Sequence, residues 1–453
     1  MKDDLVDTLA AAVRRAPGDD AEISVAERRL GASRFAGSAL TQTGVLHEHA
    51  ARVRVVVDGR VGTAATGAVD AAALDAAAAL AAESAHSQPA GGHLRHFAVP
   101  GPDRAPRGGG QWVEATAAVG PHERAAVLAR VFARAARDGL TCAGVFTTGG
   151  RRVAVATRGG VAVSHRWTEA TLSVIAVDGD ASGHAGFASG DIARLDDAAV
   201  ADKACATAAR ARGAVEATPD AYDVVLAPPA VTELLEWMAM TSFGARAVLD
   251  GTSFLGDGDG PAVDPRITIV DDCAYDHPDV IGAPFDAEGT ARARVAFIAG
   301  GRAGQPVCDL ATAARLGRES TGHAAPATET LDIDGPGPAH VVLLPGESTV
   351  DELVAGVDRG LYVTRFHYVN GLLDTRRATM TGMTRDGTFA IQGGRIGRAV
   401  RNLRFTESIV EALGRVGGIG RDVEAVPTHW TPLGAYLAPA VCLRSFRFTG
   451  RSR

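Results

Sequence analysis

Residues 51–66, which read ARVRVVVDGRVGTAAT, decide the fold of the first half of the chain. Apolar and polar side chains alternate at the start of this stretch, which is typical of a strand with one buried face. Asp58-Gly59 then favours a tight hairpin turn into a second strand at 60–66. Two earlier segments, 21–26 and 34–40, alternate in the same way. Together these stretches predict an antiparallel sheet with one solvent-exposed face.

Alanine-rich helical segments alternate with strands through the rest of this half. The predicted helices cover residues 3–15, 70–87, 121–137 and 196–212. The further predicted strands cover residues 141–147, 151–157, 160–166 and 169–177. Since one pattern of helices and antiparallel strands occurs twice, we predict an N-terminal α/β domain over residues 1–220. Residues 88–120 are rich in proline and glycine and predict a long surface loop.

The second half begins with a strand at 222–227, and Pro228-Pro229 then opens a helix. The apolar residues of that helix recur at i, i+3, i+4 and i+7, which predicts an amphipathic helix. Beyond it the chain is rich in glycine turns, with short strands predicted at 266–270, 293–298, 340–344 and 441–448. Short helices are predicted at 350–357 and 407–413. We therefore predict a β-rich C-terminal domain over residues 221–453, and an α+β fold class for the whole chain.

Charge and hydropathy exclude several classes of protein. A net charge of -7 and a pI near 6.0 argue against nucleic-acid binding, which requires a basic surface. The sequence contains no apolar stretch of the roughly 18 to 20 residues that a membrane span needs, and no secretory signal. We therefore predict a cytoplasmic protein that binds neither nucleic acid nor membranes.

Few motifs in the chain point to chemistry. There is no P-loop and no G-x-S-x-G nucleophile elbow. The five cysteines are scattered without a C-x-x-C pair, so neither a disulfide framework nor a cysteine-rich zinc site is expected. His47-Glu48-His49 is the most metal-like cluster, but it fits an exposed polar strand better. Ser320, Thr321 and His323 bring hydroxyls and an imidazole into one loop, although no third group that would orient the histidine is evident.

Several segments in a fixed order carry a resemblance to a known family. They span almost the whole chain, and they read AEISVAERRLGASRFAGSALTQ (21–42), RVRVVVDGRVGTAATG (52–67), YDVVLAPPAVTELLEWM (222–238), GTSFLGDGDGPAVDPRITIVDD (251–272), APFDAEGTARARVAFIAGG (283–301), LATAARLGRESTGHA (310–324) and LAPAVCLRSFRFTG (437–450). In this combination the chain resembles the TldD/PmbA family, a group of metallopeptidase-related proteins also called modulators of DNA gyrase. The resemblance implies a heterodimer of two similar chains.

The active chain of such a pair carries His-Glu-x-x-x-His on the helix after the VVLAPP-like strand, with a cysteine near the C-terminus as a further zinc ligand. In this sequence Glu236-Trp237 stand where His-Glu is expected, and Thr241 stands near the second histidine. No histidine occurs between residues 184 and 277, and Cys442 falls after the expected cysteine position. The resemblance therefore implies a PmbA (TldE)-type subunit that has no catalytic or metal-binding residues of its own, with zinc expected in the partner.

Three functions stay open at this point. The first is a non-catalytic subunit that pairs with a TldD-like His-Glu-x-x-x-His homologue and completes a cavity for unstructured peptides or peptide-derived substrates. The second is a diverged, amide-cleaving hydrolase of a biosynthetic pathway, active only with its partner. The third is a binding or regulatory protein that acts without any peptidase. The candidates for substrate or partner contact are Ser320, Thr321, His323 and His367.

Overall fold

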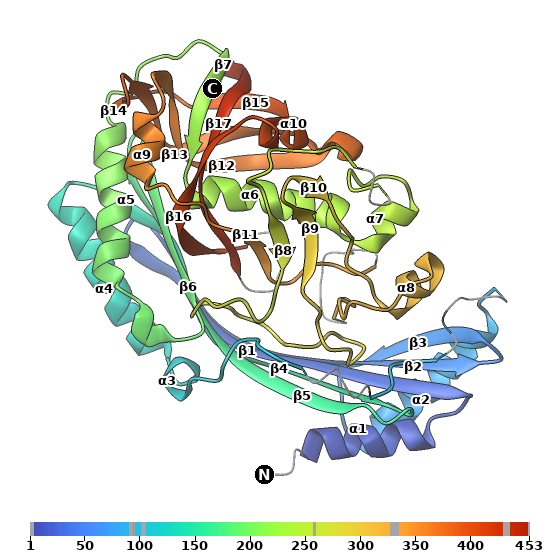
Figure 1. Cartoon of the computed structure of the whole chain (residues 1–453). Coiled ribbons are helices and arrows are strands. Elements are labelled where there is room, and N and C mark those ends of the chain that lie inside the picture. Colours follow the sequence, from blue (N-terminus) through green and yellow to red (C-terminus); the bar gives the residue numbers. More distant parts are fainter. Residues whose placement is uncertain are drawn as a thin grey trace.

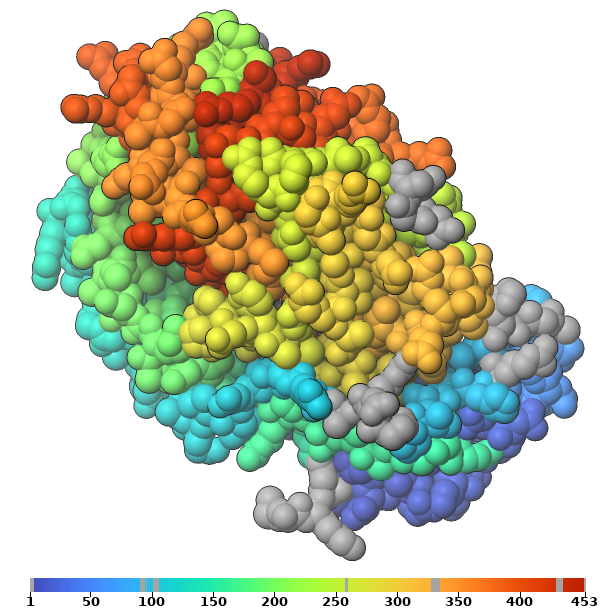
Figure 2. All heavy atoms as spheres, in the orientation of Figure 1, coloured from blue at the N-terminus to red at the C-terminus, as the bar shows by residue number. Residues whose placement is uncertain are grey.

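The computed structural model describes residues 4–89, 94, 96–100, 106–256, 260–326, 335–428 and 435–451. Within these ranges the strands form two sheets, one of six strands in the N-terminal half and one of eleven in the C-terminal half. Helices accompany both sheets, which confirms the predicted α+β class. The C-terminal half lies over one face of the long N-terminal sheet, and the space-filling view shows the two halves packed together (Figures 1 and 2).

The N-terminal sheet is antiparallel throughout, in the order β3-β2-β1-β4-β5-β6. Its strands are β1 (Asp20–Ala36), β2 (Ala39–Val57), β3 (Arg60–Thr66), β4 (Thr141–Thr157), β5 (Ala162–Asp178) and β6 (Ala181–Ser189). The sequence predicted more and shorter strands, because glycines and arginines interrupt the apolar alternation. The backbone continues in the ladder through these interruptions: Leu30 pairs with Gly149, and Arg29 pairs with Gly150. The predicted segments 141–147 and 151–157 are therefore one strand.

Helices cover the two ends of the outer face of this sheet, which is the face away from the C-terminal half (Figure 1). At one end α1 (Asp4–Arg15) and α2 (Ala71–His86) bury an apolar cluster that includes Leu9, Leu74 and Ile23. At the other end α4 (Pro121–Arg137) and α5 (Asp197–Ala211) enclose a second cluster. The short helix α3 (Glu114–Ala117) precedes α4, and a 3-10 turn covers Ile192–Arg194. The middle of the outer face lies between the two clusters.

The sheet of the C-terminal half contains a closed ring of five strands, β7-β12-β13-β15-β17. The ring closes because β17 (Ala435–Arg451) pairs with β15 (Leu403–Ser408) and also with β7 (Ala221–Leu226). The other ring strands are β12 (Arg359–Asp374) and β13 (Thr379–Gln392). The remaining strands are β8 (Ile269–Asp271), β9 (Val295–Ala299), β10 (Arg302–Ala303), β11 (Val341–Leu343), β14 (Arg395–Ala399) and β16 (Val416–Pro427). This ring agrees with the predicted β-rich character of the half.

The helices of this half are mostly short. They are α6 (Pro228–Met238), α7 (Ala245–Leu249), α8 (Leu310–Leu316), α9 (Val350–Ala355) and α10 (Ile409–Leu413), with a π-helical turn at Ala239–Phe243 and a 3-10 turn at Thr375–Arg377. The amphipathic character predicted for α6 is wrong, because its polar residues Thr232, Glu233 and Glu236 are buried as well. In the described ranges no helix combines the length and the apolar character that crossing a bilayer requires.

Candidate functional site

Helix α6 lies at the centre of the C-terminal half and meets the N-terminal sheet through a small cavity of about 30 Å³. The cavity is lined on one side by Glu233 and Glu236, which are 8 % and 2 % exposed. Because they are three residues apart on a helix, the two carboxylates share one face of α6. Ser173 and His184 of the sheet line the opposite side, and Ser173 Oγ lies 3.1 Å from His184 Nε2. The cavity has room for about two water molecules.

A buried ion pair borders the same cavity. Arg365 of β12 lines it, and its Nε lies 2.6 Å from Oδ2 of Asp386. Both side chains are largely buried, at 11 % and 2 % exposure. A buried charge pair of this kind fixes geometry, since loss of either partner leaves an uncompensated charge. The cavity beside α6 is therefore a buried junction between the two halves of the chain, lined by both charged and apolar side chains.

The positions on α6 that the resemblance assigns to a zinc motif do not fit a metal centre. Trp237 is an apolar residue that is 6 % exposed, and the hydroxyl of Thr241 donates to the carbonyl oxygen of Trp237 over 2.8 Å. Of the three positions only Glu236 could supply a ligand, whereas zinc takes three or four nitrogen, sulfur or oxygen ligands. Elsewhere in the described ranges no three His, Cys, Asp or Glu side chains are placed to hold a metal ion together.

The structure brings three of the four predicted contact residues together in the loop that follows α8. Ser320 Oγ and Thr321 Oγ1 each donate to the carbonyl oxygen of Cys308, over 3.2 and 3.1 Å. Thr321 Oγ1 also lies 3.0 Å from Nδ1 of His323, a fully buried imidazole. His367 lies on β12 instead, where its ring contacts Tyr368. Burial, together with Arg365 and Arg385, lowers the pKa of His367.

Asp271 is the third group that the sequence did not reveal. Its Oδ1 lies 3.1 Å from Nε2 of His323 and 3.8 Å from Nδ1 of His340, and all three side chains are buried. Burial alone would raise the pKa of Asp271, but the facing imidazoles hold it well below its usual value. Thr321, His323 and Asp271 thus lie in a row of hydroxyl, imidazole and carboxylate, in which His323 Nδ1 is also 2.8 Å from the carbonyl oxygen of Thr321. The feature that could have pointed to Asp271 is its position as a charged residue at the end of a buried strand, Ile269–Asp271.

This chain of groups is closed to solvent on its histidine side, and the threonine hydroxyl is already engaged. The backbone N–H of Cys308 donates to Thr321 Oγ1 over 2.7 Å, and the Thr321 hydroxyl in turn donates to the carbonyl oxygen of Cys308. A nucleophile needs a free lone pair and room for a substrate carbonyl. In this conformation the cluster therefore fixes the loop, and reaction at Thr321 would require the loop to open.

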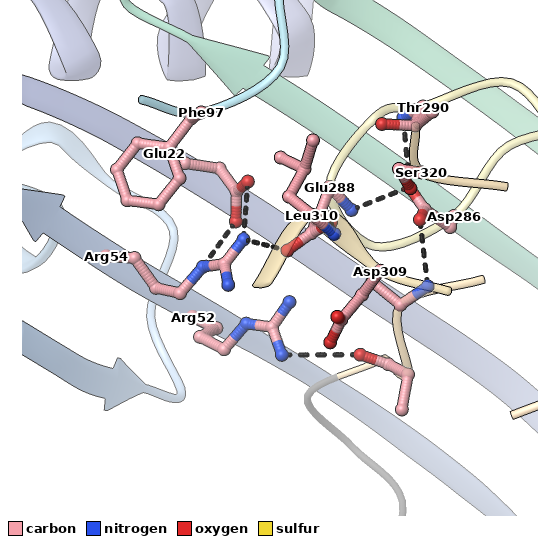
Figure 3. Close-up of polar contacts among 12 residues, drawn as sticks. Glu22, Arg52, Arg54, Phe97, Asp286, Glu288, Thr290, Asp309, Leu310 and Ser320 are labelled. Atoms are coloured by element: carbon pink, nitrogen blue, oxygen red, sulfur yellow. Dashed lines mark hydrogen bonds and ion pairs between the residues drawn. The ribbon is translucent and has the colours of Figure 1, made fainter. Parts of the chain in front are cut away.

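The loop is anchored to the N-terminal sheet by a buried charge network (Figure 3). Arg54 of β2 binds Glu22 of β1 through two hydrogen bonds, at 2.9 and 2.8 Å, and reaches Glu288 of the C-terminal half at 2.8 Å. Glu288 also accepts the backbone N–H of Leu310, the first residue of α8. Asp286 accepts backbone N–H groups from its own turn and from Ala324. The network therefore joins strands of one half to the loops of the other.

Electrostatics decide the protonation of this network. Burial raises the pKa of Glu288 to about 8, although the Arg54 charge acts against that rise. Burial also raises the pKa of Asp286. For Arg54, burial would lower the pKa, but Glu22 and Glu288 raise it above its usual value. The guanidinium thus stays charged, while Glu288 titrates close to physiological pH.

The chain resembles known proteins in both sequence and structure. Residues 219–450 match the family model of the PmbA/TldA metallopeptidase C-terminal domain. A curated protein of Methanothermobacter thermautotrophicus named "Metalloprotease" is 26% identical over 203 residues. That match covers 44% of this chain and 43% of the relative, so the chain spans less than half of the relative's length.

Three solved structures share the fold over almost their whole length. TldE from Thermococcus kodakarensis superposes with a TM-score of 0.84 at 16% identity, covering 98% of this chain and 99% of that one. A putative modulator of a DNA gyrase from Thermotoga maritima superposes with a TM-score of 0.83 at 19% identity, covering 98% of this chain and 99% of that one. A putative modulator of DNA gyrase from Bacteroides thetaiotaomicron superposes with a TM-score of 0.80 at 18% identity, covering 99% of this chain and 98% of that one. At these identities the likeness establishes the fold alone.

Proposed function

Because this chain belongs to the PmbA/TldD family of metallopeptidase-related proteins, we propose that it is the non-catalytic subunit of a two-chain zinc peptidase. Its partner is a TldD-like homologue that carries His-Glu-x-x-x-His and holds the zinc ion. In this proposal residues 221–453 form a metallopeptidase-like domain and residues 1–220 form a separate N-terminal domain. Both chains act in the cytoplasm.

The side chains of α6 carry this proposal. A catalytic zinc centre combines neutral imidazoles with a carboxylate that deprotonates the attacking water. Glu236, Trp237 and Thr241 supply no imidazole, and the hydroxyl of Thr241 is bound within the helix. The helix instead carries two buried carboxylates into a cavity that has space for water alone. Its contribution is the shape and rigidity of the C-terminal half.

The role that remains is to complete an enclosed cavity with the partner. An unstructured peptide, or a substrate derived from one, enters that cavity and reaches the zinc ion of the partner. In this arrangement the present chain supplies one wall and contacts the peptide, with Ser320, Thr321, His323 and His367 as the candidate contact residues. Enclosure would restrict access to chains that are already unfolded.

Metal analysis of the purified proteins tests this proposal. The chain is purified alone and after co-expression with its His-Glu-x-x-x-His homologue, and zinc is measured by mass spectrometry. We expect a heterodimer in which zinc is stoichiometric with the partner, no zinc in the isolated chain, and peptide cleavage by the complex only. Tight, stoichiometric zinc in the isolated chain, or cleavage by it, would contradict the proposal. A partner variant with His-Glu replaced by Ala-Ala is the control for zinc loss within an intact complex.

The Thr321–His323–Asp271 chain favours a second candidate, the amide-cleaving hydrolase subunit. The structure supplies the orienting carboxylate for the histidine, the group that the sequence left unidentified. In that reading the hydrolytic groups lie in this chain, and the loop after α8 opens when the partner binds. Thr321 would then act as the nucleophile and His323 as its base.

Substitution in the assembled complex separates the two candidates. Thr321→Ala should leave cleavage by the zinc-loaded complex within about threefold of wild type if the chain is non-catalytic. If Thr321 is the nucleophile, activity should fall by at least about a thousandfold, as it does when a nucleophile is removed from other hydrolases. Thr41→Ala, at an exposed threonine of the β1–β2 hairpin, is the matched control. Size-exclusion chromatography confirms that the heterodimer persists in both variants.

A further inference from the structure

The middle of the outer sheet face, between α1 and the α3–α4 segment, contains a groove of about 1250 Å³. It lies on the face opposite the α6 cavity, since Ser164 and Arg166 of β5 line the groove whereas Ser173 of the same strand lines the cavity. The groove is larger than a typical small-molecule pocket. Its size and its place make it independent of the site that the proposed function uses.

Arg124 of α4 forms part of the groove wall and is a buried cation that has no carboxylate partner among the residues that the structure describes. It is 1 % exposed, yet its guanidinium donates only to neutral acceptors, namely Ser33 Oγ at 3.0 Å, Thr148 Oγ1 at 3.0 Å and the carbonyl oxygen of Val119 at 3.2 Å. Its Nη2 has no hydrogen-bond partner. Buried arginines are ordinarily paired with an acid. The uncompensated charge therefore points to an anion that the groove receives from outside the chain.

Two exposed arginines of the floor add to this positive charge. Arg29 of β1 and Arg166 of β5 make no ion pair within the described ranges of the chain. Arg166 is held in place by stacking on the ring of Trp112, with the guanidinium carbon 4.6 Å from the ring centroid. Arginine side chains bind carboxylates through two parallel hydrogen bonds. Three such groups from three different elements thus surround one groove.

The floor is kept open by glycine. A Cβ on Gly31 would lie 2.4 Å from Nη1 of Arg124, and a Cβ on Gly150 would lie 2.4 Å from the ring of Trp112. Side chains at these two positions would displace the guanidinium and the indole that shape the groove. The two glycines therefore preserve both the space and the position of the binding groups.

The acidic groups at the groove decide which anion fits. Glu27 lies 3.3 Å from Nε2 of His47, Glu114 accepts the indole N–H of Trp112 at 2.9 Å, and Asp4 also lines the groove. A nucleic acid presents an uninterrupted row of phosphates, which these carboxylates would repel. A peptide with separated carboxylates can place its charges at the arginines alone. We propose that this outer groove binds a carboxylate-rich peptide segment through the exposed Arg29 and Arg166, with the buried charge of Arg124 adding to the positive potential beneath them.

Fluorescence anisotropy with a fluorescein-labelled peptide of repeated Glu-Gly-Gly units, whose carboxylates are separated, tests the proposal on the full chain. We expect saturable binding that weakens as salt is raised, and no binding of a matched Lys-Gly-Gly peptide. Arg29→Ala combined with Arg166→Ala should weaken binding by at least about tenfold, because two charge-assisted contacts are lost. Arg302→Ala is the matched control and should bind like wild type, because Arg302 of β10 is exposed and makes no ion pair with any residue that the structure describes.

Two further arms separate the sources of the anion. Inorganic phosphate should fail to displace the peptide when it is compared with chloride at the same ionic strength. A labelled single-stranded oligonucleotide should bind at least about tenfold more weakly than the peptide. Arg124→Met removes the buried positive charge beneath the groove and should weaken peptide binding by at least about threefold, while the circular dichroism spectrum stays unchanged. Absence of binding of the Glu-Gly-Gly peptide, equal binding by the Arg29/Arg166 double variant, displacement by phosphate, or tighter binding of the oligonucleotide would each overturn the proposal.

Discussion

Two buried arginines on opposite faces of the same sheet have contrasting environments. Arg54 on the inner face binds two carboxylates, Glu22 and Glu288, and these raise its pKa. Within the described part of the chain, Arg124 on the outer side has neutral partners alone, and burial lowers its pKa. A buried charge that is fully paired holds parts of a fold together, whereas a buried charge without a counter-ion is available to a ligand. The inner face is therefore built for stability and the outer groove for binding.

Removing the paired arginine should give the largest effect. Arg54→Met leaves Glu22 and Glu288 buried without their cation, so we expect a loss of about 3 to 5 kcal/mol in the free energy of unfolding. Urea denaturation followed by circular dichroism measures this loss. Arg302→Met should leave the urea midpoint unchanged, because Arg302 is exposed and has no ion pair within the described ranges. Equal midpoints for the two variants would show that the inner network does not stabilise the junction.

The second prediction concerns the pH dependence of that network. The pKa of Glu288 is about 8 in the folded chain, well above its usual value of 4.5, so the folded state binds a proton that the unfolded state releases. The stability due to this group is fully present below pH 4.5 and is lost as the pH rises through about 8. Glu288→Gln should therefore reduce the loss of stability between pH 5 and pH 9 by an amount on the order of a few kcal/mol.

Urea midpoints at a series of pH values check this expectation. Glu352→Gln is the control, because Glu352 is an exposed carboxylate whose pKa is lowered by its hydrogen bonds to Thr349. Its variant should keep the wild-type slope above pH 5. A Glu288→Gln curve parallel to that of wild type would mean that Glu288 stays ionised across the whole range.

The smallest effect is expected at the unpaired arginine. Arg124→Met removes three hydrogen bonds to neutral groups but also relieves a buried charge without a counter-ion, so stability should change by only about 1 kcal/mol. Differential scanning calorimetry of this variant beside Arg54→Met would sharpen the contrast between the two faces. A loss as large as that of Arg54→Met would mean that Arg124 is itself a structural anchor.

The elements with local signals could be predicted from the sequence. α2 starts where Asp70 caps it, since the side chain accepts the N–H of Ala73, and α4 spans the predicted 121–137, with a proline at its start. The long strands could not be predicted with their true length, because strand continuity depends on neighbours that lie far apart in sequence. Leu30 stays in the ladder because Gly149 faces it, and that pairing is invisible in a local window.

The polar clusters could not be predicted for the same reason, because their members are brought together by the fold and lie far apart in sequence. Arg54 and Glu288 are separated by 234 residues, so no spacing rule connects them. Ser320, Thr321 and His323 could be singled out because they are adjacent, whereas Asp271 joins them through the fold alone. Arg124 looks like an ordinary charged residue of a surface helix until Ser33 and Thr148 are found beside it. Whether the four predicted contact residues touch a substrate or a partner stays a prediction.

The closed ring of the C-terminal half has a consequence for how the chain is made. β7 pairs with β12 and with β17, and the second of these pairings joins Leu226 to Val441. A ribosome synthesises β7 long before β17, so during that interval the edge of β7 has no partner and α6 has no complete wall to pack against. Contacts this distant in sequence form slowly, and exposed strand edges in the meantime invite aggregation. We therefore expect nascent chains that stop before β17 to be clients of chaperones.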